Sequence, residues 1–393
     1  MQTLNADVLI VGAGIIGASA AYFLSRQGKR VLLCDAGQSG TKASGVNFGG
    51  VRRQGRPLVQ MPLAARSHVL WSRLSELIGI DGEYIRSGHL KVAFTPGDLE
   101  RLKQYNAMVA TCGLDLQLLD DADVRRRYPW LGPELAGASL CPEDGHANPR
   151  LVSPALAWAA QQAGAVLMEH CRITRSHFDG THFVSDTADG RRIRSACLVN
   201  AAGAWAGTIA QMFGDAVPLG EIYPQMGVTE PLPPIMNVVV GVQGGGLYAR
   251  QVARGNIIFG GSRARSVDPG FARPSHQSVS LLLTRLAGLI PGIANASVIR
   301  FWSGVEGATP DLNPILGASA TIPGLFHGFG YSGAGFQVGL ASGEVLAQLI
   351  VSGASPIPID AFRIDRFAAD SGKLHTPSSH AGKRNTDEIS ISK

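Results

Sequence analysis

Three glycines and one aspartate form the clearest chemical pattern in this chain of 393 residues. Gly12, Gly14 and Gly17 form a G-x-G-x-x-G sequence, and Asp35 follows roughly 20 residues after the first glycine. In such a pattern the glycines permit a tight turn, a close approach of the backbone to a pyrophosphate, and close packing of a helix on a strand. The acid accepts a hydrogen bond from a ribose hydroxyl. The spacing predicts a bound adenine dinucleotide; the alternative is a glycine-rich turn in another α/β sheet.

The elements that must position these residues flank the glycines. Residues 8–11 are all apolar, as expected of a parallel strand buried on both faces. Small and apolar residues continue at helical spacing to Gln27, and Gly28 occupies the position of a glycine that ends a helix. Residues 31–34 form a second buried strand that ends at the acid. The first turn of the helix would direct its free N–H groups and its positive dipole end toward the phosphates.

Composition indicates a core-rich globular protein with two domains, because the chain exceeds the usual size of one hydrophobic core. Hydrophobic residues make up 45% of the chain and charged residues 17%, and the formal net charge is +5. This charge is mild for the length, and basic residues alternate with acids, so we expect no nucleic-acid partner. A modest attraction to anionic substrates is compatible with the same charge.

Cysteine usage and hydropathy bear on the compartment. The five cysteines include no C-x-x-C pair, which argues against a local iron–sulfur or zinc site and favours reduced thiols in the cytoplasm. Peripheral attachment to the inner membrane through an electron acceptor stays open. Residues 8–24 form a long apolar run, but its glycines and the lack of a basic flank argue against a signal peptide or a membrane span. We therefore expect no integral membrane segment.

Strand and helix patterns of the same kind recur in the middle and near the end of the chain, separated by β-rich segments. Further helices are expected at residues 63–78, 98–112, 121–128, 149–163, 277–289 and 335–350. The sequence therefore predicts an α/β fold with a dinucleotide domain made of residues 1–85, 146–217 and 298–367. A mostly antiparallel sheet domain of residues 86–145 and 218–297 is interleaved with it, and residues 368–393 are expected to be a disordered tail.

Four motifs occur in order along the chain: the N-terminal glycine fingerprint, N-A-A-G-A-W at residues 200–205, W-S-G-V-E-G-A-T-P-D-L-N-P-I-L-G at 302–317, and G-F-G-Y-S-G-A-G-F-Q at 328–337. Together they resemble the D-amino-acid oxidase/sarcosine oxidase (DAO) family of FAD enzymes, and the resemblance extends to about Phe367. Residues 44–54 and 302–306 look closest to sarcosine oxidase β-subunit-like and to D-hydroxyproline or opine dehydrogenase β-subunit-like chains.

The resemblance implies FAD as the cofactor. It also implies a Rossmann-like FAD-binding domain of the glutathione-reductase type, interleaved with a mostly antiparallel β-sheet substrate domain. The glycines near residue 333 would form a second helix N-terminus beside the N1/O2 side of the flavin, where negative charge grows on reduction. The expected cofactor contacts are Gly12, Gly14, Ile15, Ile16, Gly17, Asp35, Ala36, Ser44, Asn47, Phe48, Gly49, Gly50, Ile173, Ala201, Ala202, Gly203, Trp205, Gly304, Gly330, Gly333, Ala334, Gly335, Phe336 and Gln337.

The chemistry of the resembled family is hydride transfer to flavin N5 from the C–H next to an amine nitrogen, giving an imine that water hydrolyses. This reaction depends on orientation and an unprotonated amine more than on an acid–base pair. In relatives that oxidise α-amino acids an arginine often follows the W-x-G motif, whereas this chain has Glu306. Glu306 would either attract a cationic or secondary amine or form a surface ion pair.

A substrate carboxylate calls for a guanidinium in place of the missing arginine. The candidates are Arg52 and Arg53 in the loop after the fingerprint and Arg250 on a sheet strand. Arg53 would alternatively be solvated or hold a phosphate. Tyr248 would close the pocket or belong to the core, and His89 and His327 are expected to be structural. The expected catalytic residues are Arg53, Tyr248, Arg250 and Glu306.

Two absences shape the functional expectation. Monomeric sarcosine oxidases attach FAD through a cysteine shortly after the W-x-G region, and this chain has no cysteine beyond Cys197, so non-covalent FAD is predicted. Those oxidases also use a lysine on a sheet strand to activate oxygen, and residues 256–263, which look equivalent, contain none. We therefore expect a dehydrogenase that transfers electrons to another carrier, with partner subunits as one route.

The leading prediction is an FAD-dependent dehydrogenase of a small secondary amine or D-amino acid, such as D-hydroxyproline, D-proline, sarcosine or an opine. One alternative is an oxygen-using oxidase of the glycine or sarcosine type. Another is a non-catalytic flavoprotein subunit of a larger complex. A purely NAD-dependent enzyme is disfavoured because the three later motifs would have no role in it.

Overall fold

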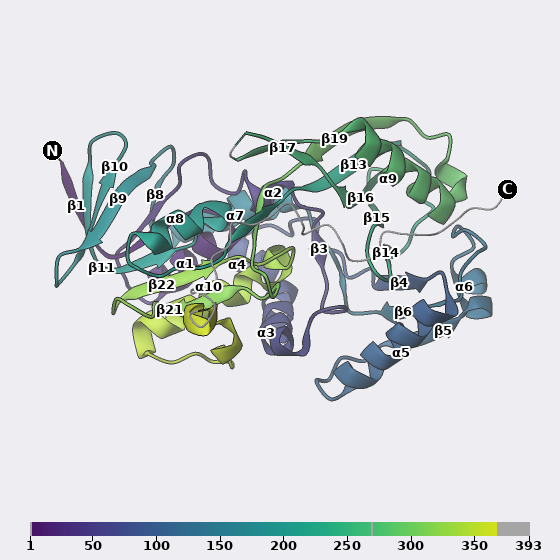
Figure 1. Ribbon diagram of the computed structural model, residues 1–393, viewed down its shortest axis with the longest axis horizontal. Coiled ribbons are helices and arrows are strands. Elements are labelled where there is room, and N and C mark those ends of the chain that lie inside the picture. Colours follow the sequence, from purple (N-terminus) through teal and green to yellow (C-terminus); the bar gives the residue numbers. More distant parts are fainter. Residues whose placement is uncertain (1, 269, 368–393) are drawn as a thin grey trace.

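The first strand lies at the centre of an eight-stranded sheet whose middle is parallel (Figure 1). The computed structural model describes residues 2–268 and 270–367. The strand order is β21-β22-β11-β1-β2-β8, and β10 and β9 extend β11 as an antiparallel hairpin. The bounds are β1 (Thr3–Val11), β2 (Val31–Cys34), β8 (Val166–Met168), β9 (Ile173–Phe178), β10 (Phe183–Thr187), β11 (Arg192–Asn200), β21 (Ile315–Ala318) and β22 (Leu325–Phe329).

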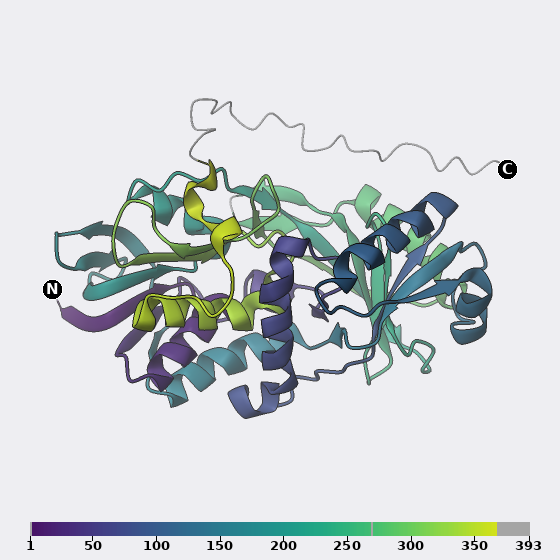
Figure 2. The ribbon, with the colours of Figure 1, turned by 90° about the horizontal axis from the view of Figure 1, so that it is seen from below.

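Alternate residues of β1 face opposite layers, as the period of a strand requires. Val8 and Ile10 belong to a core cluster beneath the helices, whereas Leu9 and Val11 belong to a cluster under the β9–β10 hairpin and α8 (Ala206–Gln211). Both faces of the strand are therefore buried, which explains its continuous apolar run. Three helices pack on the first face, as Figure 2 shows: α1 (Ile15–Arg26), α7 (Pro149–Gln162) and α10 (Gly335–Ser352).

Helix α10 is long and apolar enough to cross a membrane by length and composition alone, but 61% of it is buried inside the protein. It packs on α1 along one side and on α3 (Met61–Ser72) along another. Such burial is typical of the central helix of a core. The helix ends at Gly353, whose φ of 74° is the left-handed conformation that a terminating glycine adopts.

The second sheet also has eight strands, in the order β19-β13-β16-β15-β14-β4-β6-β5. All its pairings are antiparallel except the one between β14 and β4. Its core lies beneath α9 (His276–Leu289) and α6 (Asp121–Arg127), and α5 (Pro96–Ala110) packs on β4 and β6. The bounds are β4 (His89–Ala93), β5 (Gln117–Asp120), β6 (Gly137–Cys141), β13 (Pro224–Pro231), β14 (Val239–Val242), β15 (Tyr248–Gln251), β16 (Asn256–Arg263) and β19 (Val298–Ser303).

Short two-stranded sheets supplement the two large ones. β3 (Gly50–Val51) pairs with β7 (Gly145–His146), and β12 (Gly220–Ile222) pairs with β20 (Glu306–Ala308). A third pair joins β17 (Arg265–Asp268) to β18 (Phe271–Arg273). The chain thus passes repeatedly between the two halves of Figure 1, and this confirms the expected α/β fold with an interleaved, mostly antiparallel sheet.

Several element bounds differ from the sequence-based expectation. The helix expected at residues 63–78 is two helices, α3 and α4 (Leu74–Ile78), which are separated at Arg73. α5 begins before residue 98, because Thr95 and Asp98 form a reciprocal cap at its start. A short helix, α2 (Ala43–Val46), lies in the loop after Asp35. The expected domain boundary at residue 298 falls at the start of β19, an edge strand of the second sheet. The expected tail, residues 368–393, lies outside the described residues.

Candidate functional site

A cavity of about 1290 Å³ lies where the two large sheets meet. Its walls come from the glycine-rich turn, the loop of residues 42–57, the segment of residues 201–212, and the loop before α10. Met226 of β13 and Tyr248 of β15 line it from the second sheet. A space of this size, with walls drawn from both sheets, is suited to a dinucleotide together with a small substrate.

The backbone packing of the turn requires glycine at positions of the glycine fingerprint. Gly12 has a φ of 105°, and a Cβ on it would lie 2.3 Å from the carbonyl oxygen of Ala201. A Cβ on Gly17 would lie 1.9 Å from the carbonyl oxygen of Gly12. The amide of Gly12 donates to the carbonyl of Cys34 at 2.7 Å, which ties the turn to the end of β2. These contacts leave no room for side chains where the turn packs on β11 and α1.

Asp35 is held beside this turn and lines the cavity. Its Oδ2 accepts a hydrogen bond from the amide of Ala13 at 2.8 Å, and its Oδ1 accepts one from the amide of Gly37 at 2.8 Å. A carboxylate has about four acceptor positions, so capacity remains for a ribose hydroxyl. Ala36 and Ile173 line the same end of the cavity. The predicted role of Asp35 is thus compatible with its position.

The loop of residues 44–50 is fixed from several directions. Ser44 Oγ accepts a hydrogen bond from the amide of Ile15 at 2.9 Å, at the start of α1. Asn47 Oδ1 accepts one from the amide of Gly49 at 2.8 Å. The indole of Trp302 donates to the carbonyl of Val46 at 2.7 Å, so the W-S-G-V-E sequence supports this loop. Ser44, Asn47, Phe48, Gly49 and Gly50 all line the cavity.

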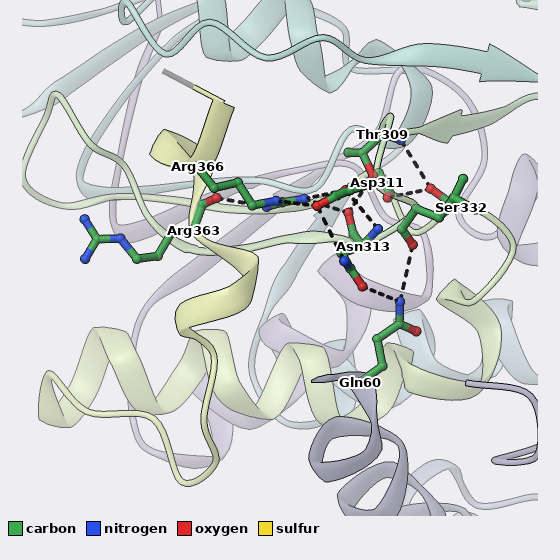
Figure 3. A network of polar contacts seen from close by, with 9 residues as sticks. Gln60, Thr309, Asp311, Asn313, Ser332, Arg363 and Arg366 are labelled. Atoms are coloured by element: carbon green, nitrogen blue, oxygen red, sulfur yellow. Dashed lines mark hydrogen bonds and ion pairs between the residues drawn. The ribbon is translucent and has the colours of Figure 1, made fainter. Parts of the chain in front are cut away.

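The wall before α10 is positioned by the polar network drawn in Figure 3. Thr309 donates its amide to the Ser332 hydroxyl at 3.2 Å, and its own hydroxyl donates to the carbonyl of Asn313 at 2.6 Å. Gln60 Nε2 donates to Asn313 Oδ1 at 3.0 Å, and Arg366 pairs with Asp311 at 2.9 Å. The T-P-D-L-N-P sequence therefore holds the glycine-rich loop against the turn just before α3 and against the C-terminal segment.

The substrate end of the cavity carries both signs of charge. Arg52, Arg56 and Glu306 line it together with Tyr248 and His89. Arg56 is 6% exposed, and its Nε has no hydrogen-bond partner among the described residues. Burial, together with Arg52, lowers the pKa of Arg56 to about 9. Burial raises the pKa of the Glu306 carboxyl to about 7, although the neighbouring Arg56 acts in the opposite direction.

Two of the expected substrate-binding arginines are placed elsewhere. Neither Arg53 nor Arg250 lines the cavity. Arg53 lies beside the buried Asp144, with Nε 3.7 Å from Oδ1, and its amide donates to the same oxygen at 2.8 Å. Arg250 donates to the carbonyls of Phe48 and Ala147 and to His146. In this structure both arginines support the cavity wall from behind.

Most expected cofactor contacts line the cavity; Gly17, Gly304 and Gln337 do not. Gln337 is buried, donates to the carbonyl of Ala64 at 2.9 Å, and secures α10 to α3. His327 is buried against Asp215, with a separation of 2.9 Å, as a structural histidine would be. His89 lines the cavity, and its Nδ1 is 2.7 Å from Gln54 Oε1.

Arg56 is the site residue that sequence reasoning left out of its candidates. It is the third arginine of the loop that also contains Arg52 and Arg53, so the loop itself was the available signal. Only the fold shows that Arg52 and Arg56 line the cavity and that Arg53 does not.

The parallel sheet, the glycine turn with Asp35, and the cavity that reaches a second sheet define a dinucleotide-binding protein with a separate substrate-binding sheet. Residues 7–349 match the family model described as "FAD dependent oxidoreductase", and the chain belongs to this DAO family. It is therefore an FAD-dependent enzyme that acts on the C–N groups of amines or amino acids.

Three relatives indicate the range of the family around this chain. It is 30% identical to glycine oxidase of Geobacillus kaustophilus over 94% of this chain and 100% of that protein. It is 29% identical to one of the subunits of the opine oxidase of Rhizobium meliloti, over 93% of this chain and 99% of that one. The structure of L-proline dehydrogenase from P. horikoshii superposes with a TM-score of 0.87 at 25% identity, covering 94% of this chain and 99% of that chain.

The residues present fit FAD. Gly203 and Gly333 line the cavity, and a Cβ added to either would meet no atom of the described residues within 4 Å, so their lack of side chains keeps the cavity open. The first turn of α1 and Ser44 would hold the pyrophosphate, and Asp35 the adenosine ribose. The loops of residues 47–50 and 330–336 would hold the flavin, with the N-terminus of α10 at its edge.

Proposed function

We propose that this enzyme is a dehydrogenase of small amino acids or secondary amines, of the D-hydroxyproline, D-proline, sarcosine or opine kind. Its electrons would go to a carrier other than oxygen. The observation that carries the substrate assignment is the presence of Arg56 and Glu306 in one cavity. A molecule with a carboxylate and an amine presents opposite charges to these two side chains.

Arg56 is suited to bind the carboxylate. Within residues 2–268 and 270–367, its Nε is buried without a partner, and its Nη2 has only a long contact of 3.5 Å with the carbonyl of Ala334. A buried guanidinium without acceptors is costly, and a carboxylate supplies two acceptors in the matching geometry. Arg52 lines the same end of the cavity and adds a second positive charge.

Glu306 then faces the amine, and two aromatic residues shape the space between the charges. The rings of Phe48 and Tyr248 lie 4.5 Å apart at their centroids, and both residues line the cavity. FAD, when bound, supplies the acceptor for the hydride. The residues of this chain bind the substrate, orient its C–H bond and exclude water.

The assignment of a non-oxygen acceptor rests on β16. Residues 256–263 form this strand between β13 and β15, and it carries no lysine of the kind that oxygen-activating relatives are expected to have. The likeness to a protein named as a subunit of an opine oxidase supports a partner subunit as the route for electrons.

Anaerobic reduction of the bound flavin tests the substrate assignment. The holoenzyme is mixed with sarcosine, D-proline, D-hydroxyproline and an opine, and each bleaching rate is compared with that of an analogue that lacks the carboxylate, such as pyrrolidine for D-proline. We expect bleaching by at least one amino acid and little by its analogue. If no compound bleaches the flavin, the proposed substrate class is wrong. Equal rates for D-proline and pyrrolidine would show that Arg56 does not bind the substrate carboxylate.

Oxygen reactivity tests the acceptor. Enzyme reduced by substrate is mixed with aerated buffer or with an artificial electron-accepting dye. Slow reoxidation by oxygen and fast reoxidation by the dye are expected. The identity to a glycine oxidase favours an oxidase as the second candidate, and rapid hydrogen peroxide formation with air alone would establish it.

A further inference from the structure

An α-amino group or secondary amine carries a proton at neutral pH, whereas a C–H bond gives up hydride readily only next to a neutral nitrogen. Either the enzyme selects the scarce free amine from solution or a side chain removes the proton after binding. The cavity contains a side chain that is able to remove the proton from the bound ammonium.

Glu306 is the carboxylate that lines the substrate end of the cavity. It lies on β20, where Ile222 of β12 is its register partner. In the described part of the chain, no side chain or backbone N–H donates a hydrogen bond to its carboxylate. The carboxylate oxygens are thus available to a ligand, and the strand β20 fixes the backbone from which the side chain extends.

The charged and titratable groups around Glu306 favour this role over a static ion pair. Arg56 and Tyr248 face it from the loop and from β15, and Arg52 faces those two. On the neighbouring strand, Glu221 is exposed and accepts a hydrogen bond from the Tyr223 hydroxyl at 2.6 Å. No direct hydrogen bond between Glu306 and either arginine is formed among the described residues, so the acid is not neutralised by contact.

We propose that Glu306 is a catalytic residue that accepts the proton of the bound substrate ammonium and thereby generates the neutral amine from which hydride is lost. This inference rests on the proposed function. In the step, one N–H bond breaks and one O–H bond forms on the carboxylate. The electron pair of the broken bond stays on nitrogen, and nothing is oxidised or reduced. The carboxyl returns its proton to water after the product leaves.

The acidity of Glu306 suits the transfer. Burial raises its pKa to about 7, which is closer to that of an ammonium than an exposed glutamate would be. A carboxylate of low pKa would hold an ammonium as an ion pair without taking its proton. Tyr248 does not fill the role, since burial raises its pKa above the usual value of a phenol. His89 already contacts Gln54 through Nδ1, and burial lowers its pKa well below the usual value.

The pH dependence of anaerobic flavin reduction tests the proposal, in the wild-type holoenzyme and in Glu306→Gln, Glu306→Asp and Glu221→Gln. Glu221→Gln is the matched control, since it makes the same change on the paired strand outside the cavity. In the wild type and the control, the second-order rate constant should fall tenfold per pH unit below about 7. In Glu306→Gln it should fall by about 100-fold or more at pH 7 and recover only near the pKa of the substrate amine. Glu306→Asp should keep the wild-type profile at a reduced rate.

Binding of a permanently charged ligand gives a readout that does not depend on turnover. Glycine betaine carries a carboxylate and a quaternary nitrogen with no proton to lose, and its binding is followed by the visible spectrum of the flavin. Its affinity should rise as Glu306 ionises in the wild type and should be independent of pH between about 5 and 8 in Glu306→Gln.

The proposal would be overturned if the rate constant of flavin reduction in Glu306→Gln fell below about pH 7 as it does in the wild type. A betaine affinity that varies with pH equally in both proteins would also overturn it. If no amine reduces the wild-type flavin, the proposed function itself fails, and the two failures are thereby distinguishable. Flavin content and thermal stability of each variant establish that it is folded.

Discussion

The Arg250 guanidinium donates a hydrogen bond from Nε to the carbonyl of Phe48, 2.9 Å away, across 202 residues of sequence. Its Nη1 lies 2.9 Å from His146 Nδ1, and its Nη2 donates to the carbonyl of Ala147. Since burial lowers the pKa of His146 to about 3, the imidazole is neutral at physiological pH and accepts this hydrogen bond. One buried arginine therefore joins β15, β7 and the loop that would cover the flavin.

This arrangement predicts that Arg250→Met destabilises the protein by about 3–5 kcal/mol, because it leaves buried acceptors unpaired. FAD affinity should fall with it, since the loop of residues 47–50 loses its anchor. Arg250→Lys should rescue little, because an ammonium lacks the planar fork that reaches three acceptors. Denaturant unfolding and FAD titration measure both effects. Normal FAD affinity in Arg250→Met with loss of substrate binding alone would instead indicate a direct contact with substrate.

Gly203 offers a test of the cofactor cradle with a matched control. Its φ is 59° and that of Gly190 is 84°, and a Cβ on either would meet no atom of the described chain within 4 Å. Alanine at each position should cost about 1 kcal/mol of stability through backbone strain. Only Gly203 lines the cavity, so only Gly203→Ala should weaken FAD binding. Equal FAD dissociation constants for the two variants would show that the cofactor does not approach Gly203.

Asp35→Ala should raise the FAD dissociation constant by roughly 10- to 100-fold, since hydrogen bonds to a charged group contribute about 1.5–3 kcal/mol. The loss would combine the ribose contact with the two amides, of Ala13 and Gly37, that the carboxylate now holds. The control is Asp7→Ala, which removes the exposed pair with Arg30 at 2.7 Å. Titration of the apoprotein with FAD should give Asp7→Ala the same FAD dissociation constant as the wild type. A wild-type dissociation constant in Asp35→Ala would contradict the assignment of Asp35 to the ribose.

The parts of the site that could be predicted from sequence are those set by local backbone geometry. Gly12 and Asp35 belong to one strand–turn–helix–strand unit, and the steric conflicts that require glycine arise within it or with the adjacent strand. The fold class followed from the alternation of such units with β-rich segments. Local patterns also missed a helix break: Arg73 separates α3 from α4, and its flanking residues carry no proline or glycine.

The directions of the arginines could not be predicted, because they depend on partners far away in sequence. Arg53 contacts Asp144, which lies 91 residues later in the sequence, whereas Arg56 lines the cavity. Arg250 suits a substrate carboxylate on residue type alone, but carbonyls of two distant segments occupy it. The raised pKa of Glu306 likewise depends on burial, which a single sequence does not reveal.

Acid precipitation tests the prediction of non-covalent FAD. Cys171 is the one cysteine that lines the cavity among the described residues, and it lies at the Asp35 end, away from the substrate-binding residues. All flavin should remain in the supernatant after precipitation, leaving a colourless pellet. Yellow colour on the washed pellet would refute the prediction, and peptide mapping would then identify the attached residue, with His89 of the cavity wall as a further position to inspect.

Arg56→Met should separate stability from function. In the apoprotein, Arg56 is a buried cation whose Nε lacks a partner in the part of the chain that the structure describes, and its lowered pKa reflects the cost of keeping that charge away from water. Replacing it with an apolar side chain of similar length should therefore stabilise the apoprotein by roughly 1–3 kcal/mol. The same change removes the proposed carboxylate ligand, so kcat/KM for an amino acid should fall by about 100-fold, while the slow reaction of an amine without a carboxylate stays nearly constant.

Thermal unfolding of the wild type and of Arg56→Met, with and without a non-oxidisable carboxylate, tests whether Arg56 binds the carboxylate. The ligand should raise the unfolding midpoint of the wild type and leave that of Arg56→Met unchanged. A variant that is less stable than wild type yet responds normally to the carboxylate would show that Arg56 serves the fold and that another group, with Arg52 the nearest choice, binds the substrate.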